Sequence, residues 1–383
     1  MKKKLILVTA AAMMLASCGG NNNNGSSQYV TEPEVKAELK VEDAAKKLTT
    51  VAKNLSTSTA LGIHADGGLE ISTENKVTKD ESLGIDRDYG SSVSASLKDL
   101  SLDLNMSGLV GVSKDSYSAA DFRASLGLSG KVSASLVSNS PTYVIESDDY
   151  KLSYLDLNEK LPETALNLKT YLDGGYVYAD VDESLNKVAQ FFLKTLGGVG
   201  LNLGEESSIA YTGKIKAEAP ESLIGGLATI NVTLSGALGS FAVALAEGAV
   251  SGAFASFASA SDSSLASLFS FKEYVNGTYG FTCDLDFATL IKYIAGGADA
   301  ESAIGNLKGS FQFALNFDES KILSFGVSAD LNSNNVTPAY SSKIAVKGGA
   351  KVSFAYGNDV KVEQVTDKDS YKDLTPSVEP EEE

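Results

Sequence analysis

The 383-residue sequence lacks tryptophan altogether and contains one histidine and two cysteines. A Ser-His-Asp triad would have to use His64 as its base, and no cluster of metal-ligating residues surrounds it. If Cys18 is modified, Cys283 is the only remaining thiol, so no intramolecular disulfide is expected. Cys283 lies in an alternating segment and is expected to be a small buried residue. We therefore expect neither an enzyme nor a bound cofactor.

The sequence also lacks an excess of positive charge. The formal net charge is −17, and loss of Lys2, Lys3 and Lys4 with a signal peptide would bring it to −20. Nucleic acid requires a basic patch, so an acidic chain argues against such a partner. No phosphate-binding loop or zinc-protease motif occurs, and neither Asp180-x-Asp182 nor Asp284-x-Asp286 continues as a calcium loop. No metal site is expected.

Residues 1–17 have the layout of a secretory signal peptide. Three lysines precede an apolar run from Leu5 to Leu15, and small residues follow it. The run is too short to span a bilayer. Leu15-Ala16-Ser17-Cys18 resembles the bacterial lipobox, which implies that Cys18 is diacylated and becomes the first mature residue. We therefore expect a protein on the extracytoplasmic face of a bacterial cell envelope, held to the membrane by acyl chains, since two chains give a stable anchor.

Residues 18–40 are expected to connect this anchor to a folded body. Gly19, Gly20 and the run Asn21 to Gly25 bury nothing and resist helix and strand formation. A flexible coil from Gly19 to Pro33 would reach about 20 Å on average. The segment is therefore predicted to be a tether.

The folded body begins with a helical pattern and continues with strands. Apolar residues at spacings of three and four predict an amphipathic helix over 41–55. From Val93 the period changes to two, with a slip at Asp99 that predicts a bulge or short turn. Serine and glycine fill many alternate positions, which is typical of antiparallel strands with one apolar and one polar face.

Four glycine-containing pairs predict turns between these strands. Asp173-Gly174 and Asn276-Gly277 predict tight hairpins of type I′, each followed by a helix. Asp182 and Asp286 lie where the N-caps of those helices belong. Gly348-Gly349 and Gly357-Asn358 predict two further turns.

Two segments interrupt or end this pattern. Residues 222–271, rich in Ala, Ser and Gly, are compatible either with a helix or with a low-complexity loop. Glu247 makes a second membrane span unfavourable. The polar residues 367–383, which end in EPEEE, predict an acidic disordered tail.

The order of these parts resembles that of the LolA/LppX-like lipoprotein carriers. The stretches YLDGGYVYADVDESLNKVAQFF and FQFALNFDESKILSFGVSADL are the most suggestive, and the resemblance spans 41–365 with 222–271 as an apparent insertion. It implies a half-barrel-like sheet with lipid acyl chains between sheet and helices. We expect one α+β domain over 41–366: a mainly antiparallel, strongly curved sheet whose concave face is covered by helices.

The expected function is binding or carriage of a hydrophobic ligand such as a lipid. The alternative is a non-enzymatic surface, adhesion or structural lipoprotein. Apolar positions that mix Phe and Leu with many small residues leave volume beneath a curved sheet, although small residues also permit close packing. The expected cavity is lined by apolar side chains from helices and strands: Phe192, Phe254, Phe257, Phe287, Ile291, Phe313 and Phe325.

Overall fold

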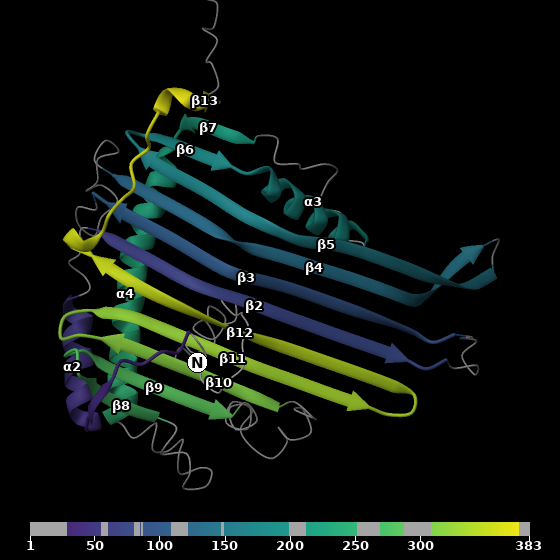
Figure 1. Ribbon diagram of the computed structural model, residues 1–383, viewed down its shortest axis with the longest axis horizontal. Coiled ribbons are helices and arrows are strands. Elements are labelled where there is room, and N and C mark those ends of the chain that lie inside the picture. The colour runs from purple at the N-terminus through teal and green to yellow at the C-terminus, as the bar shows by residue number, and fades with distance from the viewer. Residues whose placement is uncertain are drawn as a thin grey trace, which may run out of the picture.

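The computed structural model describes residues 29–54, 60–79, 85, 87–108, 122–146, 149–198, 212–250, 269–286 and 308–374. Within these ranges the strands form one open sheet in the order β1-β8-β9-β10-β11-β12-β2-β3-β4-β5-β6-β7-β13 (Figure 1). All pairs are antiparallel except β13 with β7. The strand bounds are β1 Val35–Glu38, β2 Leu61–Val77, β3 Tyr89–Ser107, β4 Arg123–Glu146, β5 Asp149–Asp173, β6 Tyr176–Val181, β7 Gly213–Glu218, β8 Phe269–Tyr274, β9 Tyr279–Asp286, β10 Lys308–Phe317, β11 Ile322–Val336, β12 Tyr340–Tyr356 and β13 Lys372–Asp373.

Two irregularities re-phase the long strands so that their apolar side chains stay on one face. In β3 the two residues between Lys98 and Ser101 oppose a single residue in β4, and Asp99 adopts a φ of 49°. This confirms the bulge predicted at Asp99. In β5 a second register shift lies between the partners of Val132 and Ala134. Each bulge adds one residue to its strand, which restores the alternation and bends the strand locally.

The predicted amphipathic helix is confirmed as α2 (Val41–Asn54), whose Ala44, Ala45, Leu48 and Val51 are buried. Helix α3 (Glu183–Gly198) follows Asp182, whose carboxylate accepts a hydrogen bond from the Ser184 amide at 2.8 Å. The N-cap prediction at Asp182 is therefore correct. A helix after Asp286 would lie outside the described residues.

Helix α4 (Glu221–Val250) decides the open question for the described part of 222–271 in favour of a helix. Its 30 residues are about 45 Å long. Eight neighbouring strands, from β9 to β5, span roughly 34 Å at 4.8 Å spacing. The helix is therefore long enough to cross all of them, as Figure 1 shows.

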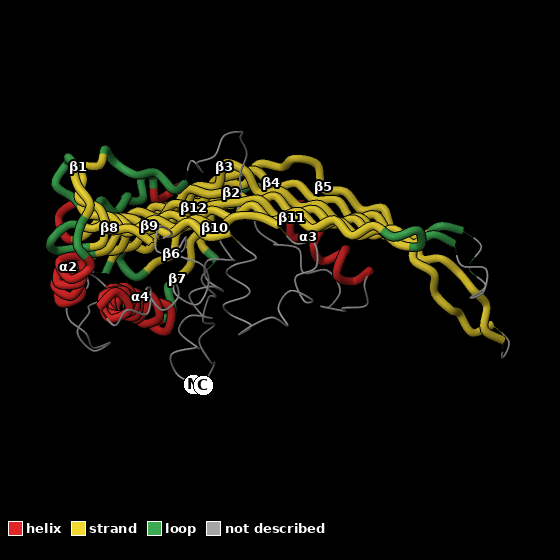
Figure 2. Tube along the Cα trace, turned by 90° about the horizontal axis from the view of Figure 1, so that it is seen from below, coloured by secondary structure: helices red, strands yellow, loops and turns green. Residues whose placement is uncertain are grey.

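The helices and the sheet form two layers over part of the sheet. Figure 2 shows the sheet edge-on as a curved layer with α2, α3 and α4 on the same side. The larger core lies between α2, α4 and strands β8 to β11; it contains Leu48, Ala242 and Phe281. A second core joins Ile224 of α4 to Leu61 of β2 and to neighbouring strand ends. The fold is thus a mostly β, open and curved antiparallel sheet with helices packed on one side.

The C-terminal prediction of a tail from residue 367 is wrong for residues 367–374. This part forms a 3₁₀ turn, η6 (Lys368–Ser370), and strand β13, which pairs with β7. Tyr371 is buried against Tyr178, with their ring centroids 5.3 Å apart in an edge-to-face arrangement. Polar composition missed this segment because a single aromatic anchor and a sheet edge hold it.

Two of the predicted turns differ from the structure in position or type, and one is absent. The loop between β5 and β6 is Gly174-Gly175, with φ values of 60° and 80°, one residue later than predicted. Between β8 and β9 only Gly277 has positive φ, so the turn is not type I′. Gly348 and Gly349 lie within β12, where the missing side chain of Gly349 gives room for Tyr29. Gly357 does begin a 3₁₀ turn, η5 (Gly357–Asp359), as predicted.

We expect Gly277→Val to destabilise the fold by about 1–3 kcal/mol, because a β-branched residue opposes the φ of 81° at this position. Gly277→Asn is the matched control, since asparagine tolerates the left-handed region. Thermal unfolding of the three proteins measures the effect. Equal melting temperatures for the Val and Asn variants would refute the role of this turn.

Candidate functional site

The register gives the sheet one apolar and one polar face. Residues opposite each other in paired strands share a face. One such row runs from Phe325 through Val352, Ala65, Leu102 and Leu128 to Leu168. Val327 on the same face is buried in the core beneath the helices. The helices therefore pack on the apolar face.

Near the helices this apolar face is filled by side chains. Phe313 is buried, and its ring centroid lies 6.0 Å from that of Phe241 and 6.1 Å from that of Phe281. Phe325 packs against the same core and lies 5.9 Å from Phe354. The structure thus brings two of the expected cavity residues together at this core, where their rings pack against other aromatic side chains.

The other five expected cavity residues fall, in whole or in their side chains, outside what the structure describes. Phe192 belongs to α3. The remaining four lie outside the described residues: Phe254, Phe257, Phe287 and Ile291. Those predictions are therefore not tested.

Cys283 lies in the same core and is buried, as expected. Burial, together with the nearby Asp284 carboxylate, raises the pKa of its thiol to about 12. A thiol with this pKa stays protonated at neutral pH, so Cys283 is a packing residue and a poor nucleophile.

Farther along the strands the apolar face continues beyond the cores. We name this part the distal apolar face and define it by eight residues in two adjoining rows: Ile71, Val93, Ala95, Ala134, Leu136, Leu331, Ile344 and Val346. None of them belongs to the buried clusters formed by the described residues. Val93 and Ile344 are 37% and 42% exposed. The sequence prediction missed these residues, although the two-residue alternation of their strands contains the signal.

The opposite face is polar and carries many serines. Ser72, Ser94 and Ser135 lie opposite one another across β2, β3 and β4. Charged side chains on this face pair with their neighbours, for example Lys343 with Glu74 at 3.1 Å. This composition suits contact with water or with other polar groups.

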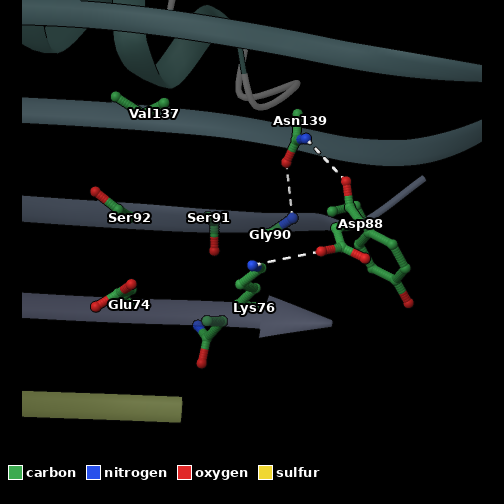
Figure 3. A pocket seen from close by; sticks show the side chains of 10 residues that line it. Glu74, Lys76, Asp88, Gly90, Ser91, Ser92, Val137 and Asn139 are labelled. Atoms are coloured by element: carbon green, nitrogen blue, oxygen red, sulfur yellow. Dashed lines mark hydrogen bonds and ion pairs between the residues drawn. The ribbon is translucent and has the colours of Figure 1, made fainter. Parts of the chain in front are cut away.

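An open hollow of about 320 Å³ lies at the far end of β2, β3 and β4 (Figure 3). Most of its lining residues are polar, and several of their side chains already have partners. Asn139 accepts a hydrogen bond from the Gly90 amide at 2.7 Å and donates one to the Asp88 carbonyl at 3.3 Å. Lys76 lies 3.4 Å from the Asp88 carboxylate. These satisfied groups argue against an apolar ligand at this hollow.

His64 is the most distinctive ionisable group on the polar face. Its Nδ1 lies 2.6 Å from Asp103, and its Nε2 lies 2.7 Å from Asp66. Burial lowers the pKa of His64, but the hydrogen bonds to the two carboxylates raise it more, so the pKa is raised overall. Only the imidazolium form donates from both ring nitrogens. This arrangement is a charged surface network on adjacent strands.

The described ranges also bear on metal binding and on membrane spanning. No group of three or more His, Cys, Asp or Glu side chains there is arranged to hold a metal ion. None of the helices in those ranges has the length and apolar character required to cross a lipid bilayer. The distal apolar face is therefore the candidate site that the described residues offer.

Comparison with known proteins does not identify a family. No family model matches the sequence, and no curated protein matches it. Among solved structures, the crystal structure of Pseudomonas aeruginosa OpdL is 8% identical, with a TM-score of 0.10, over 78% of this chain and 98% of that one. A similarity this low relates neither fold nor function.

We expect His64 to make the stability of the fold depend on pH. Its unfolded-state pKa is about 6.5, and its folded-state pKa is raised. The stabilisation is therefore fully present below about pH 6.5 and is lost as pH rises through the folded-state pKa. The melting temperature of the wild type should exceed that of His64→Gln by more at low pH than at high pH. Asp103→Asn should weaken the same dependence. A difference between wild type and His64→Gln that stays constant with pH would contradict this assignment.

Proposed function

We propose that the protein is a non-enzymatic, lipid-anchored protein on the extracytoplasmic face of a bacterial cell envelope, and that it binds a hydrophobic ligand such as a lipid. The ligand lies on the distal apolar face. The observation that carries this proposal is the continuation of one apolar face past the helix-packed cores to half-exposed Val93 and Ile344. A contiguous apolar surface that is exposed to solvent often marks a binding site.

The dimensions of the distal apolar face suit an acyl chain. Its rows cross five strands, β11, β12, β2, β3 and β4. Four spacings of 4.8 Å make roughly 19 Å. One leaflet of a bilayer core, which an acyl chain spans, is about 15 Å thick. A chain laid across the strands would therefore contact the whole row.

The energy of such contact favours a ligand with two chains. A chain resting on a flat face buries about half of its surface, so each CH₂ contributes about 0.4 kcal/mol, half the value for full burial. About 15 such groups give about 6 kcal/mol, which corresponds to a dissociation constant of tens of micromolar. Two chains side by side would bind much more tightly.

In this proposal the helices set the limits of the site. Helices α2 and α4 pack on one end of the apolar face, where Phe313 and its neighbours form the larger core. The ligand occupies the apolar area beyond them. This arrangement agrees with the small residues Ala95 and Ala134 at the β3–β4 end of the distal apolar face, since small side chains leave room for a bound chain.

We expect a double variant, Val93→Glu with Ile344→Glu, to weaken binding of a fluorescent acyl probe by about tenfold or more. Placing an uncompensated polar group against an apolar ligand costs roughly 1–3 kcal/mol, and a charge costs more. Residues 1–18 should be removed so that the anchor does not occupy the site, and organic extracts of the purified protein should be analysed by mass spectrometry for stoichiometric lipid.

The matched control is Ser94→Glu with Ala345→Glu, which adds the same charge to the same strands on the opposite, polar face. It should bind the probe like the wild type. Absence of both lipid and probe binding in the wild type would refute the carrier proposal and favour the surface-interaction alternative. Equal loss in both double variants would refute the assignment to the distal apolar face.

Anchoring gives a separate prediction. Cys18→Ser should leave the precursor uncleaved and unlipidated, because only a thiol accepts the lipid as a thioether. The variant should shift from the detergent phase to the aqueous phase and migrate more slowly on a gel than the mature wild type. Identical partitioning and migration of the two proteins would show that Cys18 is not the anchor.

A further inference from the structure

The first described residues run along the polar face of the sheet. Tyr29 is buried, and a Cβ placed on Gly326 or on Gly349 would overlap it. Lys351 donates a hydrogen bond from Nζ to Thr31 Oγ1 at 3.1 Å. The chain therefore begins its described course in contact with β11 and β12.

The register assigns these contacts to the polar face. Gly326 is paired with Lys351, and Gly349 with Ser328, whereas the adjacent Val327 is buried in the core under the helices. From Tyr29 the chain reaches the sheet edge, where β1 pairs with β8, and only then enters α2 on the apolar side. Tyr29, where the described chain begins, thus lies on the side of the sheet opposite to α2 and α4.

The length of chain between Cys18 and Tyr29 limits where an anchoring membrane can lie. Eleven residues as a flexible coil span about 18 Å on average. From β11 to the edge strand β1 there are four strand spacings, roughly 19 Å. A coil of average span would reach only to the edge of the sheet, so it could not also bring Cys18 to a membrane on the apolar side. For a membrane on the polar side, the coil does not have to pass around the edge.

The net charge of −17 on the whole chain would predict repulsion from anionic lipid, but the charges on the polar face are largely paired. Its lysines pair with carboxylates: Lys272 with Glu32 at 2.7 Å, and Lys347 with Asp330 at 3.9 Å. Paired charges interspersed with serine produce little net field. This face can therefore approach headgroups without the repulsion that an acidic face would meet at anionic lipid.

We infer that the polar face of the sheet lies against the lipid bilayer in which Cys18 is anchored, and that the distal apolar face points away from that bilayer. The inference rests on the proposed anchoring at Cys18. It deepens the proposed function by placing the ligand face toward the space beyond the anchoring membrane. Ligand is then exchanged on that far side rather than directly with the anchoring bilayer.

The absence of tryptophan makes a direct test possible. Single-tryptophan variants of the full, lipidated chain are added from detergent to preformed phosphatidylcholine vesicles that carry a dansyl-labelled phospholipid. The two adjacent pairs are Ser94→Trp with Val93→Trp and Ala345→Trp with Ile344→Trp, each with one position on either face. Energy transfer from tryptophan to the dansyl group reports proximity to the headgroups.

Transfer should be about twofold or more greater for Ser94→Trp and Ala345→Trp than for their partners, because side chains on opposite faces differ in depth by roughly 10 Å. Adding Cys18→Ser should abolish transfer in all four. Equal transfer within both pairs, the reverse order, or transfer that persists without Cys18 would overturn the inference. Loss of acyl-probe binding leaves this readout unchanged, so a failed ligand proposal and a failed orientation are distinguished.

Discussion

The two-residue alternation, kept in register across long antiparallel strands, is the constraint on which the rest of the structure depends. It places the apolar side chains of β9 to β5 on one face, and this face must be covered. The bulge at Asp99 preserves that alternation, because without it every residue of β3 beyond this point would face the opposite way. Helices α2 and α4 cover one end of the face, and what remains forms the distal apolar face.

Local patterns in the sequence predicted the elements well where each element is decided by its own residues. The spacing of Ala44, Leu48 and Val51 was sufficient for α2, and the slip in alternation was sufficient for the bulge. The N-cap at Asp182 and burial of Cys283 also follow from local chemistry. These features depend on periodicity and capping, which a short window of sequence contains.

The errors fall where distant residues decide the outcome. Gly349 looked like a turn residue, but it lies in a strand because Tyr29, far away in the sequence, packs against it. Tyr371 orders a polar segment through contact with Tyr178. The sequence likewise does not show that Phe241 of α4 packs beside Phe313. The exposed apolar area is found from the residues that the strand register places side by side, and not from the positions of phenylalanines in the sequence.

The central claim is that a hydrophobic ligand lies on the distal apolar face, and photo-crosslinking with a diazirine-bearing fatty acid tests it most directly. The account predicts that mass spectrometry will find adducts on peptides at Val93, Leu136 and Ile344, and that an excess of unlabelled fatty acid will suppress them. Adducts confined to the serine-rich polar face, or spread without preference over both faces and insensitive to competitor, would contradict it.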